Sequence, residues 1–253
     1  MTFLRYVKSI LPKMEAKKPD FSSIYPVELS AEEKKLLDYV IKKKLTMVSP
    51  MRLWATLMAC KHVIERNVQG DFVECGVWRG GNALIAASIF KMYSEKRNIY
   101  LFDTFSGMTA PTSFDTQILD GSAAIDEFLR SRKDGHTDWC YASLKDVRQN
   151  FADAGVLDEN IKFVVGDVLK TLERDECLPS SISVLRLDTD WYESTKKELD
   201  ILYPKLSVGG VLLIDDYGYW SGSKKATDEY FARNGGRPFL QYTDHDGRAG
   251  VKY

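Results

Sequence analysis

Four carboxylic side chains follow two apolar runs in the C-terminal half of the chain. Asp188 and Asp190 come after the run ISVLRL, and Asp215 and Asp216 come after the run VLLI. If both runs are parallel strands, these acids meet at one sheet edge and repel one another unless a cation or a shared proton is present. Oxygen ligands without a nearby histidine or cysteine favour Mg²⁺. The pattern predicts a magnesium site; the alternative is that acids such as Asp190 only cap the following helices.

A glycine-rich turn follows an earlier apolar run, FVEC. The segment ECGVWRGG starts at Glu74 with the spacing G-x-x-x-G-G, which differs from the dinucleotide and phosphate-binding glycine patterns. Gly76 would let the backbone turn, while Gly80 and Gly81 would let a ligand approach the N-terminus of the next helix. Turn geometry by itself explains such a motif equally well. The segment therefore indicates a ligand site only in combination with the neighbouring strand ends.

Acidic residues also end the second and third predicted strands. Asp103 follows the run NIYLF, where a carboxylate can accept hydrogen bonds from both hydroxyls of a ribose. Asp167 follows the run IKFVV and a glycine, where it and the adjacent backbone can bond to an adenine amino group. These strand ends suit an adenosine that carries no phosphates. S-adenosylmethionine is such a molecule.

Together these groups could transfer a methyl group to an oxygen atom. Mg²⁺ would bind the attacking hydroxyl and a vicinal one, and Asp188 or Asp190 would take the proton as general base. His136 lies in the turn-rich segment 106–142, which we expect to form a lid over the acceptor. His136 is either an auxiliary base or a solvent-exposed loop histidine, and Trp139 either stacks on adenine or belongs to the core.

Short apolar runs alternate with helical stretches from Gly70 onward. Such alternation is typical of a parallel sheet wrapped by crossover helices, so it predicts an α/β, Rossmann-like, mostly parallel, doubly wound fold with an antiparallel closing strand. Strands are expected at 72–75, 98–102, 161–165, 182–187 and 211–214, with closing strands in PFLQYT and AGVKY, and helices at 81–94, 143–154, 192–205 and 223–234.

An arm and two helices precede the first of these strands. Apolar residues at helical spacing within 1–29 predict an arm that packs on its own domain or on a partner subunit, a membrane-surface helix being the alternative. Ser30 predicts a capping box with the glutamate three residues later, and Ser49-Pro50 predicts the start of a second helix. Because the arm and helices offer apolar contacts, we expect a homo-oligomer.

The composition excludes several classes of protein. The 253 residues carry 35 Lys and Arg against 36 Asp and Glu, so no net positive charge is available to bind nucleic acid. The longest uncharged apolar stretch is far shorter than the roughly 20 residues of a membrane span, and the N-terminus does not read as a signal peptide. Four cysteines without a CxxC pair do not suit a disulfide scaffold or a zinc ribbon. We expect a cytoplasmic protein.

Six segments, occurring in order, carry a resemblance to a known family. They are TMVSPMRL (46–53), GDFVECGVWRGG (70–81), LFDTFSGM (101–108), WCYASLKDVRQNF (139–151), LRLDTDWYESTKKELDILYPKLSVGG (185–210) and LLIDDYG (212–218). Over about 45–235 the chain resembles the macrocin O-methyltransferase family, whose members transfer methyl from S-adenosylmethionine to sugar hydroxyls of natural products with Mg²⁺. The resemblance implies a class I methyltransferase domain over 46–253, after an N-terminal arm and helix over 1–45.

The resemblance also implies roles for individual residues. The metal carboxylates would be Asp188, Asp215 and Asp216, and comparison with catechol-type methyltransferases favours Asp188 over Asp190 as the first ligand. The acceptor would be a small molecule or glycan with vicinal hydroxyls. The implied cofactor-binding residues are Thr46, Met47, Glu74, Gly76, Val77, Trp78, Arg79, Gly80, Gly81, Asp103, Thr104, Ser106, Asp167 and Val168.

Two other functions share parts of this pattern. A Rossmann-like NAD-dependent oxidoreductase would use a glycine turn and a ribose-binding acid, but it would not need four carboxylates at neighbouring strand ends. A non-catalytic protein that keeps the S-adenosylmethionine pocket would bind the cofactor without any dependence on metal. Titration with S-adenosylhomocysteine and with NAD, each with Mg²⁺ and with a chelator, distinguishes these possibilities.

Overall fold

The computed structural model describes residues 25–253, so most of the expected arm, 1–29, lies outside the described residues. Helix α2 (Ala31–Lys42) begins with the predicted capping box. The Ser30 hydroxyl accepts a hydrogen bond from the Glu33 N–H at 3.1 Å, and the Glu33 carboxylate accepts one from the Ser30 N–H at 2.7 Å. Helix α3 (Pro50–Glu65) follows, with Ser49 as its N-cap. Both predicted N-terminal helices are confirmed.

Within residues 25–253, seven strands form one sheet in the order β5-β2-β1-β6-β7-β9-β8. The first five are parallel, β9 is antiparallel to β7, and the short β8 pairs with β9. This arrangement confirms the predicted Rossmann-like fold and its antiparallel closing strand. The strands are β1 (Asp71–Cys75), β2 (Ile99–Asp103), β5 (Ile161–Val165), β6 (Ile182–Leu187), β7 (Leu206–Ile214), β8 (Gln241–Tyr242) and β9 (Arg248–Val251).

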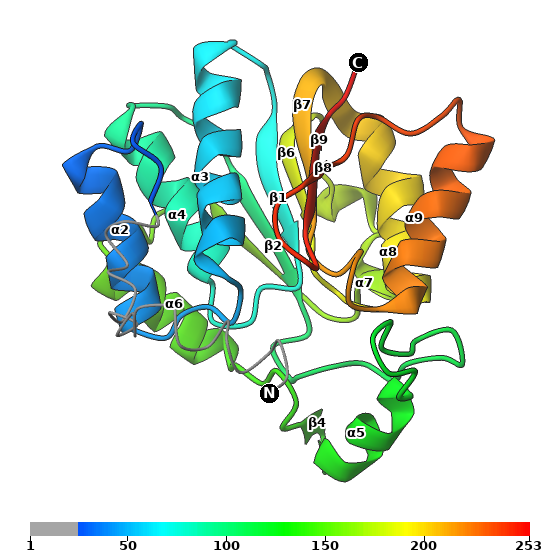
Figure 1. The fold of residues 1–253 in the computed structure, drawn as a ribbon. Coiled ribbons are helices and arrows are strands. Elements are labelled where there is room, and N and C mark those ends of the chain that lie inside the picture. Colours follow the sequence, from blue (N-terminus) through cyan, green and yellow to red (C-terminus); the bar gives the residue numbers. More distant parts are fainter. Residues whose placement is uncertain (1–24) are drawn as a thin grey trace, which may run out of the picture.

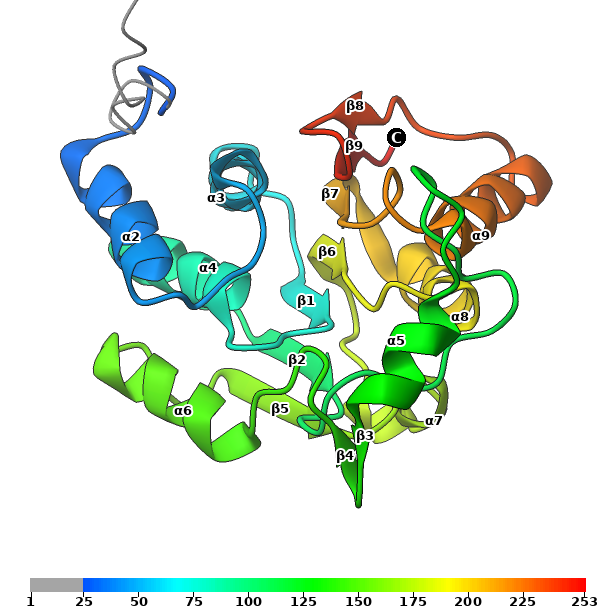
Figure 2. The ribbon, with the colours of Figure 1, turned by 60° about the horizontal axis from the view of Figure 1, so that its bottom comes forward.

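Helices cover both faces of this sheet (Figures 1 and 2). On β1, Phe72 packs into the core beside α3 and α4, whereas the next residue, Val73, packs into the core beside α8 and α9. Val184 and Leu185 repeat this alternation on β6, because successive side chains of a strand point to opposite faces. The remaining helices are α4 (Gly81–Met92), α6 (Leu144–Asp153), α7 (Val168–Thr171), α8 (Tyr192–Leu202) and α9 (Ser221–Arg233), with 3-10 turns η2 (Asp175–Cys177) and η3 (Tyr203–Lys205).

The segment 106–142 is more ordered than its turn-rich sequence predicts. It contains helix α5 (Ala124–Ser131) and a hairpin of β3 (Arg132–Lys133) and β4 (His136–Thr137). The Trp191 indole N–H donates to the Thr109 carbonyl at 3.0 Å, and Asp115 accepts a hydrogen bond from the Tyr192 N–H at 2.8 Å. These contacts fix the segment below the carboxyl ends of the strands in Figure 1, so we call it the lid.

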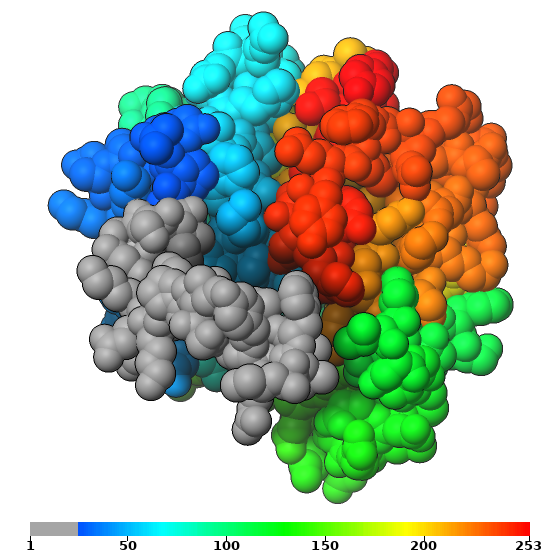
Figure 3. Space-filling model, in the orientation of Figure 1, coloured from blue at the N-terminus to red at the C-terminus, as the bar shows by residue number. Residues whose placement is uncertain are grey.

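The lid and the C-terminal segment lie on one face of the molecule in Figure 3, in green and in orange to red. Among the described helices, none combines the length and the apolar character that crossing a membrane requires.

Candidate active site

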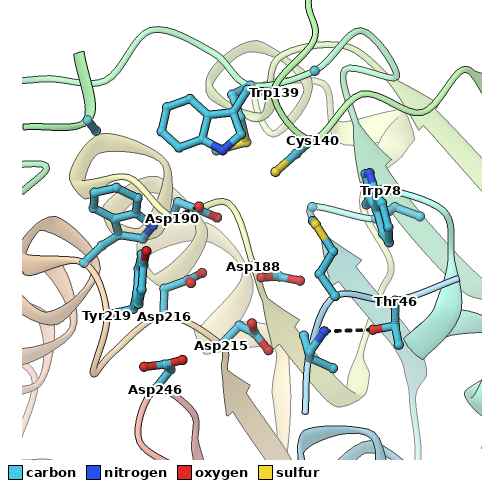
Figure 4. Close-up of a pocket in the computed structure, with 18 of the residues that line it drawn as sticks. Thr46, Trp78, Trp139, Cys140, Asp188, Asp190, Asp215, Asp216, Tyr219 and Asp246 are labelled. Atoms are coloured by element: carbon cyan, nitrogen blue, oxygen red, sulfur yellow. Dashed lines mark hydrogen bonds between the residues drawn. The ribbon is translucent and has the colours of Figure 1, made fainter. Parts of the chain in front are cut away.

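A cavity of about 850 Å³ lies at the carboxyl ends of β1, β2, β6 and β7, beside the lid. Its volume falls within the roughly 300–1,000 Å³ of typical ligand pockets. In Figure 4 Asp188, Asp215 and Asp216 stand between Tyr219 on one side and Trp78 and Thr46 on the other. The cavity brings together these predicted residues: Thr46, Met47, Glu74, Gly76, Val77, Trp78, Gly81, Asp103, Asp188, Asp190, Asp215 and Asp216.

The other predicted cofactor residues do not line this cavity. Asp167 is the N-cap of α7, where its carboxylate accepts a hydrogen bond from the Leu169 N–H at 2.9 Å, and Val168 is buried in the first turn of that helix. A helix cap therefore accounts for the Asp167 carboxylate. Arg79, Gly80, Thr104 and Ser106 surround the glycine turn and the end of β2 without reaching the cavity wall.

His136 lies on strand β4 of the lid and is also absent from the cavity lining. Its ring nitrogen lies 3.2 Å from an Asp138 carboxylate oxygen, and its ring packs against Tyr141. Both partners belong to the lid. The structure thus places the predicted auxiliary base among surface residues of the lid, apart from the carboxylates at the strand ends.

Close backbone approaches shape the glycine turn between β1 and α4. Gly76 has φ of +83°, and a Cβ atom there would lie 1.9 Å from the Asp188 carbonyl oxygen. One Asp103 carboxylate oxygen accepts hydrogen bonds from the Val77 and Trp78 N–H groups at 2.6 and 3.0 Å, and the other accepts one from Phe105. Asp103 therefore holds the turn in place, and its second oxygen keeps a lone pair for a ligand hydroxyl.

Three carboxylates form a group that suits a hard cation. Asp188, Asp215 and Asp216 each offer an oxygen atom, and these oxygens lie within 4.8 Å of one another. Burial raises the pKa values of Asp188 and Asp216, and their negative neighbours raise them further. Within residues 25–253, the Asp216 Oδ2 atom is buried without a hydrogen-bond partner. A buried carboxylate oxygen with a free lone pair is what a divalent ion would satisfy.

Arg186 lies behind this group and was not predicted as a site residue. It is 2% exposed, and one of its nitrogens donates to Glu74 at 2.9 Å and to Asp188 at 2.5 Å, while the other donates to Asp215. Burial raises the pKa of Glu74 to about 7, although Arg186 opposes the shift. Arg186 thus joins Asp188 and Asp215 to the strand that leads into the glycine turn. A charge inside the apolar run ISVLRL was the available signal.

Arg52 is a second arginine that the sequence analysis missed. From α3 it donates to Asp215, and its Nε donates to Asp244 at 2.9 Å in the turn before β9. It also lies 3.4 Å from Asp246, which lines the cavity. Both oxygens of Asp215 are therefore held by arginines, one from each side. This arrangement fixes Asp215, whereas the Asp216 Oδ2 atom has no hydrogen-bond partner among the described residues.

Asp190 differs from the three grouped carboxylates. Its backbone has φ of +69°, a conformation that non-glycine residues rarely adopt and that often marks functional sites. Its carboxylate accepts a hydrogen bond from the Trp220 indole N–H at 3.0 Å. Burial raises the pKa of Asp190 to about 7, and Asp215 contributes to this shift. Asp190 therefore lies at the cavity wall with its carboxylate held by Trp220 and its pKa raised.

Three tryptophans connect the lid to this wall. Trp139 from the lid packs edge-on against Trp191 at 5.4 Å between ring centroids, and Trp191 packs against Trp220 at 5.1 Å. Trp191 is buried, so it anchors helix α8 and the lid, while Trp139 and Trp220 line the cavity. The Tyr192 hydroxyl donates to Glu229 at 2.7 Å, which also makes Tyr192 an anchor.

Glu198 is a buried residue of helix α8, and its burial should make the stability of the protein depend on pH. One of its oxygens accepts a hydrogen bond from the Thr189 hydroxyl at 2.7 Å, and burial raises its pKa to about 8. Because the folded state keeps a proton that the unfolded state releases near pH 4.5, the free energy of unfolding falls as pH rises from 4.5 to 8. Glu198→Gln should flatten this decline in urea unfolding measured at pH 5 and pH 8. Equal slopes for the two proteins would contradict the assignment.

Comparisons with known proteins identify the family to which this chain belongs. The chain matches the family model "Macrocin-O-methyltransferase (TylF)" over residues 10–248. It is 35% identical over 206 residues to demethyldecarbamoylnovobiocin O-methyltransferase of Streptomyces niveus, covering 80% of this chain and 73% of the relative. It is 33% identical over 191 residues to 8-demethyl-8-(2,3-dimethoxy-alpha-L-rhamnosyl)-tetracenomycin-C 4'-O-methyltransferase of Streptomyces olivaceus, covering 75% and 69%.

The solved structure of the O-methyltransferase NovP has the same fold. It superposes with a TM-score of 0.71 at 34% sequence identity, over 82% of this chain and 81% of that chain. The family model spans most of the chain, and the two relatives exceed 30% identity over most of its length. The chain therefore belongs to the macrocin O-methyltransferase family and is an S-adenosylmethionine-dependent O-methyltransferase.

Proposed function

We propose that this enzyme methylates a sugar hydroxyl of a glycosylated small molecule in a reaction that requires Mg²⁺. One observation carries the proposal: the glycine turn and the group of Asp188, Asp215 and Asp216 line the same cavity. A methyl donor and a metal-bound acceptor would therefore meet there. The relative from Streptomyces olivaceus, whose name places its methyl group on a rhamnosyl 4'-oxygen, supports a sugar acceptor.

The cofactor would occupy the side of the cavity formed by the glycine turn. Thr46 and Met47 would contact its methionine end, and the free lone pair on Asp103 would accept a ribose hydroxyl. The N-terminus of α4, at Gly81 and Asn82, would face the cofactor carboxylate, because helix N-termini favour negative charge.

Asp188, Asp215 and Asp216 would hold the metal ion. When bound, Mg²⁺ supplies positive charge that lowers the pKa of an acceptor hydroxyl and orients it with a vicinal one. Arg186 and Arg52 would keep Asp215 fixed from both sides, so that its position does not depend on the ion. The residues present thus fit a divalent cation with oxygen ligands.

Asp190 would act as the general base. Asp188 already accepts a hydrogen bond from Arg186, whereas Asp190 lies outside the metal group and is aimed by the Trp220 N–H. The acceptor oxygen would form a bond to the methyl carbon as the sulfur–methyl bond breaks, which leaves S-adenosylhomocysteine. The hydroxyl proton would pass to Asp190.

Asp190→Asn should separate catalysis from binding. We expect kcat to fall about 10²- to 10⁴-fold, the usual contribution of a general base, with unchanged affinity for S-adenosylhomocysteine and Mg²⁺. Methyl transfer to a panel of glycosides followed by mass spectrometry gives kcat, and calorimetry gives both affinities. Asp175→Asn, in the exposed turn η2, is the control. Unchanged turnover in Asp190→Asn would exclude Asp190 as the base. The same turnover assay of His136→Gln tests whether His136 is an auxiliary base.

Three further statements stay predictions about this enzyme. Binding of S-adenosylhomocysteine alone does not test the use of Mg²⁺. Turnover measured with Mg²⁺ and with a chelator is therefore the deciding measurement. Light scattering tests the expected homo-oligomer. Fractionation of the native cell tests the expected cytoplasmic location.

A further inference from the structure

Asp190 occupies the centre of a strained three-residue turn between β6 and α8. The Trp191 N–H donates to the Thr189 carbonyl at 2.8 Å, and Asp190 between them has φ of +69°. A hydrogen bond that closes around one residue of positive φ is the pattern of a γ-turn of the rare, strained kind. Such a conformation persists only where the surrounding structure holds it. The contacts of the residues beside Asp190 therefore decide where its carboxylate points.

One face of helix α8 makes the contacts that hold Thr189. The Thr189 hydroxyl donates to Glu198 at 2.7 Å, and the Ser194 hydroxyl donates to the Thr189 carbonyl at 3.3 Å. Ser194 and Glu198 are four residues apart, so they share one face of the helix. Both the side chain and the carbonyl of Thr189 are thus bonded to α8. These two bonds fix the N-terminal side of the turn.

Glu198 makes its contact at a position where a carboxyl group is costly. Its side chain is fully buried, and its second oxygen, Oε2, has no hydrogen-bond partner among the residues that the structure describes. The next residue, Leu199, belongs to the apolar core. A buried polar group with an unbonded atom destabilises the fold, so an apolar side chain would suit this position better. Within residues 25–253 the Glu198 side chain bonds only to Thr189, so the turn is the structure that it supports.

We propose that Glu198 and Thr189 are positioning residues for methyl transfer, which hold the turn so that the Asp190 carboxylate faces the acceptor hydroxyl. Asp190 lines the cavity, whereas Thr189 and Glu198 do not, so both act through Asp190. Without the hydrogen bond between them, the turn relaxes and the carboxylate leaves its place beside Trp220. A displacement of about 1 Å can lower the rate about 10²-fold. This inference rests on the proposed function, because Asp190 must be the general base.

Thr189→Val tests the proposal, because valine keeps the shape of threonine and lacks its hydroxyl. In turnover on a glycoside panel with Mg²⁺, we expect kcat to fall about 10- to 100-fold while the KM for S-adenosylmethionine stays unchanged. Hydrogen exchange of the Trp191 N–H, followed by NMR without any acceptor, should become faster as the turn opens. Thr227→Val is the control: it removes a buried hydroxyl of α9 that donates to the Ser223 carbonyl at 2.9 Å, and it should keep the wild-type kcat and Trp191 exchange.

Changes at Glu198 test whether the two residues act as a pair. Glu198→Leu should lower kcat by the same factor as Thr189→Val, and the double variant should be no slower than either single variant, because each removes the same hydrogen bond. Glu198→Gln, whose amide oxygen can accept this bond, should recover most of the turnover that Glu198→Leu loses.

The outcomes separate this inference from the proposed function. If Asp190→Asn is slow, then wild-type kcat or wild-type Trp191 exchange in Thr189→Val, or an additive fall in the double variant, would overturn the positioning role alone. Wild-type turnover in Asp190→Asn would overturn the proposed base, and the positioning role with it.

Discussion

Asp216→Asn should reduce kcat about 10³-fold while the protein remains folded. The amide keeps the shape of the carboxylate but loses the charge that a metal ligand supplies, and a loss of several kcal/mol of metal-derived stabilisation corresponds to that factor. Burial already raises the pKa of Asp216, so removing its charge should leave the metal-free protein as stable as the wild type or more stable. Affinity for S-adenosylhomocysteine should not change.

Three measurements on Asp216→Asn separate a metal ligand from a structural acid. Calorimetry with Mg²⁺ should show that binding is lost, thermal unfolding should show a retained midpoint, and turnover on a glycoside panel should show the fall in kcat. Glu159→Gln, an exposed acid just before β5, is the control and should behave as the wild type. Full magnesium affinity in Asp216→Asn would remove this residue from the metal site.

Arg186→Met should produce the largest loss of stability. The substitution leaves Glu74, Asp188 and Asp215 without the cation that bonds to all three. Breaking a buried ion pair by removing one partner costs about 3–5 kcal/mol, because an uncompensated buried charge remains. Urea unfolding of the wild type and the variant gives the difference in free energy of unfolding.

Two further variants make the Arg186 result specific. Arg233→Met removes an exposed arginine that pairs with Asp200, and surface pairs contribute about 0–1 kcal/mol, so its effect should be small. Adding Glu74→Gln to Arg186→Met should recover part of the lost stability, since one buried acid is then neutral. If Arg186→Met and Arg233→Met cost the same, the buried network does not stabilise the fold as described.

Elements with a strong local signal were predicted from the sequence. The capping box at Ser30 and the N-cap at Ser49 depend on residues within three positions, and both are present. The start of β7 was predicted five residues too late, because the glycines of SVGG resemble a turn. In the structure Leu206 pairs with Ile182 and Val211 pairs with Val184, so a step of five residues along β7 matches a step of two along β6, and the two glycines lie within this irregular stretch of β7.

In the candidate site, the gathering of the carboxylates was predicted from the sequence, but their hydrogen-bond partners were not. Asp188, Asp190, Asp215 and Asp216 were predicted to gather at one edge because parallel strands end there, a rule that needs only the order of the elements, and the family resemblance then implied Asp188, Asp215 and Asp216 as the metal ligands. The order of the elements does not give the partners of each charge. Glu74 and Arg186 are register partners on β1 and β6, 112 positions apart in the sequence. Their pairing follows from strand register, which the sequence alone does not reveal.

The sequence by itself determined the fold class, the family and the edge of the sheet at which the carboxylates gather, because these depend on apolar periodicity and on local motifs. Only the tertiary structure decided that Arg186 and Arg52 hold Asp215, that Asp167 caps a helix and that His136 stays on the lid surface. Each of these depends on which segments meet across long separations in the chain, and side-chain charges find their partners only after the strands and helices have packed.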